Sequence, residues 1–324
     1  MKTILVSGAS GIIGYGVLKS LRQMKPACNL IGTTIYEDSV APAFCDIFER
    51  APLTNDPHYI DWLCKIIKKH KVDLAIPCID VDMYAWNEHR ERILETGTKL
   101  VLNNPDLINL CGDKWNFYEK LRDATPKYLI ESRLEGTFGE LKDAYGLPFL
   151  LKPRRGFASR GIVIVDSKST FDKHQKDIGP VVMAQPIVGD TETEYTVSGF
   201  FDDKSELCCF MGLRRKLAKE GFTEKAEVAS PPGVETAMKE MAAVLKPIGP
   251  TNFQFRLHDG QLKLLEINPR ISSATSIRAA FGYNESVMAA HYFLDSITPT
   301  QPRVRAGHAV RYTEDHIFYD SDTI

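Results

Sequence analysis

The sequence predicts an α/β domain with a parallel, doubly wound sheet at the N-terminus, followed by an α+β region. In the first part, short apolar runs alternate with segments of helical spacing, which is the pattern of a parallel sheet with helices on both faces. After Gly112 this alternation stops, and strand pairs joined by short loops follow. The chain has 324 residues, which is enough for two or three packed domains.

The elements of the first part follow one another at the spacing of strand–helix units. Apolar runs bounded by glycine, proline or charged residues predict strands at 2–7, 29–34, 72–77 and 99–102. Helices are expected from the first glycine loop to Met24, at 59–70 and at 81–96. The helix at 59–70 is the clearest, because its apolar residues recur every three to four positions.

The second part reads as helices and antiparallel strands. Helices are expected at 114–122, 234–245 and 285–294. Strands are expected at 147–153, 162–165, 181–185, 193–201 and 206–213. A last hairpin is expected between 252–257 and 261–267, around His258-Asp259-Gly260.

Composition excludes several classes of partner. The chain is 44% hydrophobic and 25% charged with a net charge of −2, so bulk binding to nucleic acid or to an anionic membrane is not expected. No apolar run reaches the roughly 18 residues that span a bilayer. The seven cysteines are odd in number and show no CxxC spacing, which indicates reduced thiols in a cytoplasmic protein.

A glycine loop, Gly8-Ala9-Ser10-Gly11-Ile12-Ile13-Gly14, joins the first strand to the first helix. This context suits a phosphate-cradling turn, and Glu37 lies where a ribose-binding acid would follow the second strand. Taken alone, the loop indicates a nicotinamide-dependent oxidoreductase. We favour the simpler interpretation, a tight turn with close helix–sheet packing, because an isolated glycine fingerprint is a weak signal. The only Tyr-x-x-x-Lys pair near it, Tyr15 and Lys19, falls inside the first helix, where it cannot serve a dehydrogenase.

The segment 262–270, LKLLEINPR, carries a candidate metal site. Glu266 and Asn268 are two apart on a predicted strand, so both side chains face the same way. Carboxylate and amide oxygens are hard ligands that suit Mg²⁺. Gln254 on the preceding strand would join them if the hairpin loop has three residues, 258–260. A two-residue Asp259-Gly260 turn would shift the register by one and turn Gln254 away, so we predict the three-residue loop.

Two further segments are candidates for holding a nucleotide. Lys152 ends an apolar strand and precedes a loop of small residues that includes Ser159 and Gly161, whose backbone N–H groups could approach phosphate oxygens. Glu194, at the start of a later strand, could hydrogen-bond both ribose hydroxyls. The backbone around Gln185 and Ile187 could contact the adenine edge.

These segments resemble the ATP-grasp enzymes, and among them a single unit of the carbamoyl phosphate synthetase large chain. The resemblance rests on Asp113-Lys114, LKPRRGFASRG at 151–161, EYTV at 194–197 and, most specifically, Asn268-Pro269-Arg270. It implies a Rossmann-like preATP-grasp domain over 1–112. A two-subdomain ATP-grasp fold would follow, with a small subdomain and glycine-rich flap over 113–183 and a large subdomain with the metal site over 184–324.

The resemblance also implies a role for each motif. Lys114 and Lys152 would contact the nucleotide phosphates, and Gln254, Glu266 and Asn268 would bind Mg²⁺ or Mn²⁺. Arg270 would steady the transferring phosphoryl group. The implied reaction is ligation: ATP activates a small carboxylate as an acyl phosphate, which an amine or another nucleophile then attacks. The flap at 154–161 is the natural lid over this intermediate.

Substrate contacts are expected from segments that would face the γ-phosphate. The candidates are Arg214, with its neighbours Arg215 and Lys216, and Ser272 and Arg278 after the Asn-Pro-Arg motif. Arginine suits a carboxylate because it offers bidentate donors. The carboxylate and the nucleophile stay open, and a homodimer is compatible with the sequence. A nicotinamide-dependent oxidoreductase and a non-catalytic nucleotide-binding regulator remain the alternatives.

Overall fold

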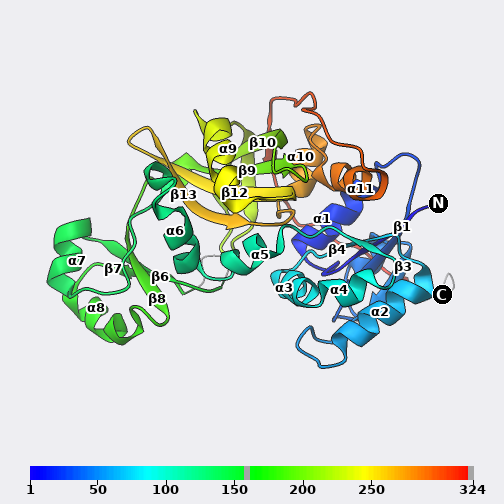
Figure 1. The fold of residues 1–324 in the computed structure, drawn as a ribbon, viewed down its shortest axis with the longest axis horizontal. Helices are drawn as coiled ribbons and strands as arrows, with labels where there is room; N and C mark the ends of the chain where they lie inside the picture. Colours follow the sequence, from blue (N-terminus) through cyan, green and yellow to red (C-terminus); the bar gives the residue numbers. More distant parts are fainter. Residues whose placement is uncertain (157–160, 320–324) are drawn as a thin grey trace.

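Three sheets organise the chain in the computed structural model, which describes residues 1–156 and 161–319 (Figure 1). A five-stranded parallel sheet forms the N-terminal domain. A three-stranded sheet forms a small subdomain, which projects away from the N-terminal domain at the opposite end of the molecule. A six-stranded sheet lies between them. None of the described helices has the length and apolar character needed to cross a bilayer.

The N-terminal domain confirms the predicted parallel sheet, with strand order β3-β2-β1-β4-β5. Its strands are β1 (Thr3–Val6), β2 (Asn29–Thr34), β3 (Ile47–Arg50), β4 (Leu74–Ile76) and β5 (Lys99–Leu100). Its helices are α1 (Ile12–Leu21), α2 (Tyr59–His70), α3 (Asp80–Glu88), α4 (Arg90–Leu94) and α5 (Pro105–Cys111). The single helix expected at 81–96 is therefore two helices that meet at His89. Strand order reverses between β2 and β4, on either side of β1, which opens a crevice at the carboxyl ends of the strands.

The small subdomain is an antiparallel sheet with order β7-β6-β8. Its elements are α7 (Phe138–Tyr145), β6 (Phe149–Pro153), β7 (Val163–Val165), α8 (Lys168–His174) and β8 (Val182–Pro186). Leu141, Phe149 and Phe171 are fully buried between the helices and the sheet. Because β8 pairs with β6, this sheet reaches Pro186, past the expected boundary at residue 183.

The large sheet is antiparallel, with order β13-β12-β9-β10-β11-β14. Its strands are β9 (Glu194–Phe201), β10 (Leu207–Leu217), β11 (Thr223–Val228), β12 (Gly249–His258), β13 (Gln261–Asn268) and β14 (His308–Val310). Residues of α6 (Lys114–Arg122) and α9 (Val234–Leu245) form one core with it. A second core joins α10 (Thr275–Ala280) and α11 (Glu285–Asp295) to the sheet and to β1 and α1. The large sheet and the N-terminal sheet therefore contribute side chains to one common hydrophobic core.

The hairpin between β12 and β13 corrects one expectation and confirms its consequence. The three-residue loop is wrong: His258 pairs with Gln261, so the turn holds two residues, Asp259 and Gly260. Gln254 nevertheless lies opposite Glu266, because a β-bulge shifts the register between Gln254 and Phe255. The extra residue is Leu265. With the two-residue turn alone, Gln254 and Glu266 would lie on opposite faces of the hairpin, and the bulge returns them to the same face.

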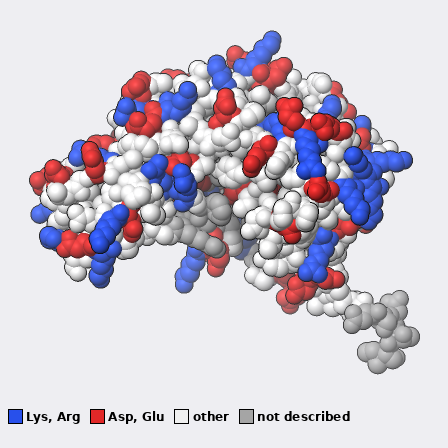
Figure 2. All heavy atoms as spheres, turned by 60° about the horizontal axis from the view of Figure 1, so that its bottom comes forward, with Lys and Arg blue, Asp and Glu red and all other residues white. Residues whose placement is uncertain are grey.

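Charges of both signs are interspersed over the face of the molecule that Figure 2 shows. Basic residues do not gather there into one broad field of the kind that binds nucleic acid. This distribution agrees with the net charge of −2.

Candidate active site

A row of polar side chains crosses one face of the large sheet, from β10 through β9 and β12 to β13. The ladder places Gln254 between Thr196 on one side and Glu266 on the other, and it places Asn252 opposite Asn268. In an antiparallel sheet such direct neighbours lie on the same face. The sheet therefore assembles one polar surface from four strands that are distant in sequence.

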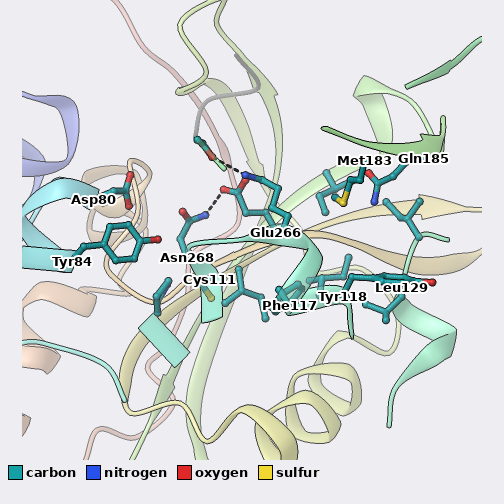
Figure 3. Close-up of a pocket in the computed structure, with 17 residues that line it drawn as sticks. Asp80, Tyr84, Cys111, Phe117, Tyr118, Leu129, Met183, Gln185, Glu266 and Asn268 are labelled. Carbon is teal, nitrogen blue, oxygen red and sulfur yellow. Dashed lines mark hydrogen bonds between the residues drawn. The ribbon is translucent and has the colours of Figure 1, made fainter. Parts of the chain in front are cut away.

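The expected metal ligands meet on this surface. Oε1 of Glu266 accepts hydrogen bonds from Nδ2 of Asn268 at 2.8 Å and from Nε2 of Gln254 at 3.5 Å, and Figure 3 shows the first of these contacts. The set has one carboxylate and two amides; among the residues the structure describes, no three His, Cys, Asp or Glu side chains gather as a metal site. This set fits Mg²⁺, which needs only one or two carboxylates when substrate phosphates complete its shell.

Two lysines flank Glu266. Nζ of Lys152 donates to the backbone oxygen of the bulged Leu265 at 2.9 Å. Burial lowers the pKa of Lys152 to about 8, against the opposing effect of the Glu266 carboxylate. Nζ of Lys114 donates to the backbone oxygen of Gly156 at 2.7 Å. Both lysines line the cavity next to Glu266, where they would meet anionic groups of a ligand.

Lys114 owes its position to the residue before it. The side chain of Asp113 caps α6 by accepting from the N–H of Trp115 at 2.9 Å. The same carboxylate accepts from Arg154 at 2.9 and 3.2 Å, which ties the start of the helix to the end of β6. The Arg154 guanidinium and these hydrogen bonds lower the pKa of Asp113, despite its burial. The two segments that carry Lys114 and Lys152 are thus held together.

Arg270 links the large sheet to the N-terminal domain. Its Nε and Nη2 donate to the two carboxylate oxygens of Asp80, at 2.7 and 3.0 Å. Asp80 lies in the first turn of α3, 190 positions away in the sequence. Burial lowers the pKa of Arg270 and the Asp80 carboxylate raises it, with a net upward shift. Arg270 is therefore a fixed positive charge beside Asn268.

Glu194 lies at this surface with both oxygens engaged. It is 5% exposed; Oε1 accepts from Arg215 at 3.0 Å and Oε2 from Arg256 at 2.9 Å. Arg215 also donates to Oε1 of Gln254 at 2.8 Å, so one guanidinium joins the expected ribose ligand to the expected metal ligand. The ribose role of Glu194 stays a prediction, and a ribose hydroxyl would have to share or replace an arginine there.

Arg215, rather than Arg214, reaches the site. Successive strand residues point to opposite faces, so Arg214 lies on the outer face and pairs with Glu227. This corrects the choice of Arg214 as the substrate contact. The signal that could have found Arg215 is the pairing of β10 with β9, because Arg214 lies opposite Tyr195 and Arg215 thus falls beside Glu194.

Ser272 and Arg278 belong to a buried network and do not line the cavities next to Glu266. Arg278 is 0% exposed and forms an ion pair with Glu285, also 0% exposed, at 3.1 Å. It also donates to Oγ of Ser272 at 2.7 Å and to Oδ1 of Asn252 at 3.0 Å. Both residues were expected to contact substrate, and the structure instead buries them against the Thr196 and Asn252 end of the polar surface, where they link α10 to α11 and β12.

The expected nucleoside and flap contacts are partly assembled. Gln185 is buried, donates to Oγ of Ser132 at 2.7 Å and lines both cavities next to Glu266. Ile187 is 37% exposed and falls outside both linings, whereas Val188 lines one of them. In the flap, Gly156 lines both cavities and Gly161 lines neither; Ser159 lies outside the described residues.

The two cavities next to Glu266 lie between the small subdomain and the large sheet. Tyr84 and Asp80 face one of them from the N-terminal domain (Figure 3). The volumes of the two cavities are about 50 and 110 Å³. Ligand pockets usually hold roughly 300–1,000 Å³. A nucleotide would therefore have to widen this space on binding.

Comparison with known proteins decides the fold. A family model for an ATP-grasp protein in the biosynthetic pathway with Ter operon matches residues 183–316, and a PylC-like N-terminal domain matches residues 17–101. Among solved structures, the N5-carboxyaminoimidazole synthetase from Staphylococcus aureus, complexed with ADP, has a TM-score of 0.74 at 17% identity, covering 94% of this chain and 80% of that one. The chain has an ATP-grasp fold.

Other ATP-grasp proteins resemble the chain to a similar extent. The biotin carboxylase of Campylobacter jejuni has a TM-score of 0.71 at 15% identity and covers 95% of this chain and 74% of that one. The carbamoyl phosphate synthase large chain of Pseudomonas aeruginosa is 24% identical over 92% of this chain. The chain spans 31% of that relative's length. The resemblance to a single unit of the synthase is thus confirmed for the fold.

Proposed function

We propose that the protein is an ATP- and Mg²⁺-dependent ligase that activates a small carboxylate as an acyl phosphate for attack by an amine or another nucleophile. One observation carries the proposal: Gln254, Glu266 and Asn268 form an oxygen-bearing set within a ring of fixed cations. The cations are Lys114, Lys152 and Arg270. Phosphoryl transfer is catalysed mainly by such positioning and charge stabilisation.

In this proposal each side chain of the site has a separate role. Lys114 and Lys152 approach Glu266 from α6 and β6 and would bind the α- and β-phosphates of ATP. Gln254, Glu266 and Asn268 would hold Mg²⁺, which neutralises charge on the β- and γ-phosphates when bound.

Arg270, oriented by Asp80, would stabilise the charge that develops on the transferring phosphoryl group. This positioning matters because a donor held in place before the reaction costs no reorganisation when the charge develops.

Two bond exchanges complete the reaction. First, the bond between the γ-phosphorus and the bridging oxygen breaks, and a substrate carboxylate oxygen bonds to that phosphorus, giving ADP and an acyl phosphate. Second, the nucleophile attacks the acyl carbon, the carbon–oxygen bond to phosphate breaks, and the nucleophile loses a proton. Solved relatives with this fold were crystallised with ADP or ATP, which supports a nucleotide in this cleft.

The glycine loop does not support the oxidoreductase alternative. A Cβ at Gly14 would lie 2.2 Å from the Gly8 oxygen, and Gly8 has a φ of +59°, so packing and turn geometry require both glycines. The N–H groups of Ala9 and Gly11 already donate to backbone oxygens of the protein. Glu37, the expected ribose ligand, is exposed and pairs with Arg50.

Phosphate release from Mg²⁺-ATP across a panel of amino acids and small carboxylic acids tests the proposal. Hydroxylamine added to the assay converts any acyl phosphate into a hydroxamate, which identifies the activated acid. Glu266→Gln should lower the stimulated rate by about 100-fold, because a lost transition-state contact costs on the order of 3 kcal/mol. The matched control is Glu235→Gln, an exposed glutamate on α9.

The outcomes separate the alternatives. Stimulation by one acid that is lost in Glu266→Gln and kept in Glu235→Gln supports the ligase. ATP binding with no stimulation by any acid, with and without hydroxylamine, would favour a non-catalytic regulator. Equal rates in the wild type and Glu266→Gln would refute the metal site.

A further inference from the structure

A third cavity, of about 730 Å³, lies in the N-terminal domain at the carboxyl ends of its strands. It is bounded by the glycine loop after β1, by the end of β2, by residues 51–55 after β3 and by α3. This is the point where the strand order reverses, and doubly wound sheets bind ligands in the crevice at that point. Its volume falls within the range of ligand pockets, whereas the cavities next to Glu266 are much smaller.

The charges around this cavity disfavour an anionic ligand. Its described lining contains two acids, Asp82 and Glu88, and no lysine, arginine or histidine. In the loop that would cradle a phosphate, the Ala9 N–H donates to the backbone oxygen of Thr33 and the Gly11 N–H to that of Gly8, at 2.9 Å each. A bound pyrophosphate would therefore meet negative charge without a basic partner.

The walls of this cavity are largely apolar. Ile35, Leu53, Ile79 and Val81 face it, and Leu53 and Val81 are 59% and 48% exposed. Soluble proteins rarely leave large apolar side chains clustered around an open pocket unless the pocket binds something. The body of the ligand should therefore be apolar.

A buried carboxylate lies among these apolar walls. Asp82 is 4% exposed, and its Oδ1 accepts from Oγ1 of Thr54 at 2.6 Å. Burial raises the pKa of Asp82, while hydrogen bonds from Thr54, Ser7 and Tyr59 oppose that rise. A cationic group of a ligand would favour the ionised carboxylate and gain a partner in a water-poor place.

The cavity adjoins the proposed phosphoryl-transfer site through α3. Tyr84 lines both this cavity and the one next to Glu266. Asp80, in the same helix, holds Arg270, while Asp82 and Glu88 face the N-terminal cavity. Tyr84 thus borders both the N-terminal cavity and the cavity next to Glu266.

We propose that this cavity binds the second substrate of the ligase, an amine whose ammonium group pairs with Asp82 and Glu88 and whose body is apolar. The inference rests on the proposed function and adds the class of the nucleophile. In the reaction the ammonium releases one proton to become a free amine. The amine nitrogen then bonds to the acyl carbon, the bond to phosphate breaks, and a second proton leaves the nitrogen. The products are an amide and phosphate; phosphate takes up one of these protons, and the other is released to the solvent.

A pocket-filling variant tests the site. Val81→Trp places a large side chain at the half-exposed wall of the cavity and leaves the protein core intact. Leu94→Trp is the matched control, because Leu94 is 44% exposed on α4 and outside the cavity lining. Each variant is titrated calorimetrically with phenethylamine, leucinamide and agmatine, and with 3-phenylpropionate and NADH as anionic probes.

Acid activation is measured separately with hydroxylamine, a nucleophile small enough to bypass the pocket. We expect at least one apolar amine to bind the wild type and Leu94→Trp, and to bind Val81→Trp at least 10-fold more weakly. Hydroxamate formation should be equal in all three proteins. If the wild type forms no hydroxamate, the proposed ligase activity itself is wrong. If hydroxamate forms normally but Val81→Trp binds the amines as tightly as the wild type does, only the assignment of the amine to this cavity is wrong.

Charge variants separate an ammonium site from a merely apolar one. Asp82→Asn and Glu88→Gln should each weaken amine binding several-fold, whereas Glu91→Gln, an exposed change on α4, should not. Thermal unfolding of each variant excludes a folding defect as the cause. Tighter binding of 3-phenylpropionate or NADH than of any amine would overturn the proposal.

Discussion

At the scale of single residues, Lys152 has the property most useful for testing the site. It lines the cavity next to Glu266 with a backbone oxygen as its hydrogen-bond partner, and burial lowers its pKa from 10.5 to about 8. A lysine with a lowered pKa in the folded state binds fewer protons there than in the unfolded chain. Between pH 8 and 10.5 the stability contribution of Lys152 should therefore rise with pH.

ATP binding should reverse this shift. Phosphate oxygens next to Nζ favour the charged form, so ATP binding near pH 8.5 should be accompanied by proton uptake at Lys152. Calorimetric titrations in buffers of different ionisation enthalpy measure that uptake directly. The uptake should disappear in Lys152→Met and persist in Lys239→Met, an exposed lysine on α9. Identical heats in all buffers for the wild type would contradict the assignment of Lys152 to the phosphates.

At the scale of elements, the junction of α10 and α11 shows why a motif near the site need not contact substrate. Arg278 and Glu285 are both fully buried, and they connect the two helices to Asn252 on β12 and to Ser198 on β9. Two charges in such a place are stable only while each keeps its partner. The pair therefore supports the strand that carries Gln254.

Removing one partner should destabilise the whole fold. Arg278→Met leaves Glu285 buried and unpaired, which should lower the free energy of unfolding by about 3–5 kcal/mol. Arg278→Met/Glu285→Gln should lose less, because no buried charge is left alone. Denaturant unfolding of the wild type and the variants measures both values. If Arg278→Lys instead has normal stability but its phosphate release is no longer stimulated by the carboxylic acid, Arg278 contacts the substrate after all.

At the scale of the whole molecule, the site lies where three bodies meet. The small subdomain supplies Lys152, the large sheet supplies the metal ligands, and the N-terminal domain supplies Asp80, which holds Arg270. The cavities between them, of about 50 and 110 Å³, are smaller than the roughly 300–1,000 Å³ of most ligand pockets. Movement of the bodies relative to one another is the expected way to make room.

Such an opening step should limit nucleotide binding. In stopped-flow mixing with a fluorescent ATP analogue, the observed rate should reach a plateau at high ligand concentration, because the opening step does not depend on ligand. Leu94→Trp, changed outside the cleft, should show the same plateau. A rate that rises linearly up to the highest concentrations would show that the cleft opens without such a barrier.

Local patterns in the sequence alone determined the N-terminal sheet and the arrangement of side chains along single strands. Alternating strands and helices predicted the parallel N-terminal sheet, and spacing by two placed Glu266 and Asn268 on one face of β13. Both inferences hold because they depend on the period of a single element. The Asn-Pro-Arg motif, with the other motifs that resemble ATP-grasp enzymes, predicted the fold that the comparisons confirm.

Tertiary structure decided what depends on register and on contacts between distant segments. The bulge at Leu265 brings Gln254 to Glu266 despite a two-residue turn, and strand pairing selects Arg215 over Arg214. Asp80 forms an ion pair with Arg270, 190 positions away in the sequence, and Arg278 is fully buried against Thr196 and Asn252. Strand period and helix spacing describe neighbours along the chain, whereas these contacts arise only when separate elements pack, because burial and pairing are properties of the packed whole.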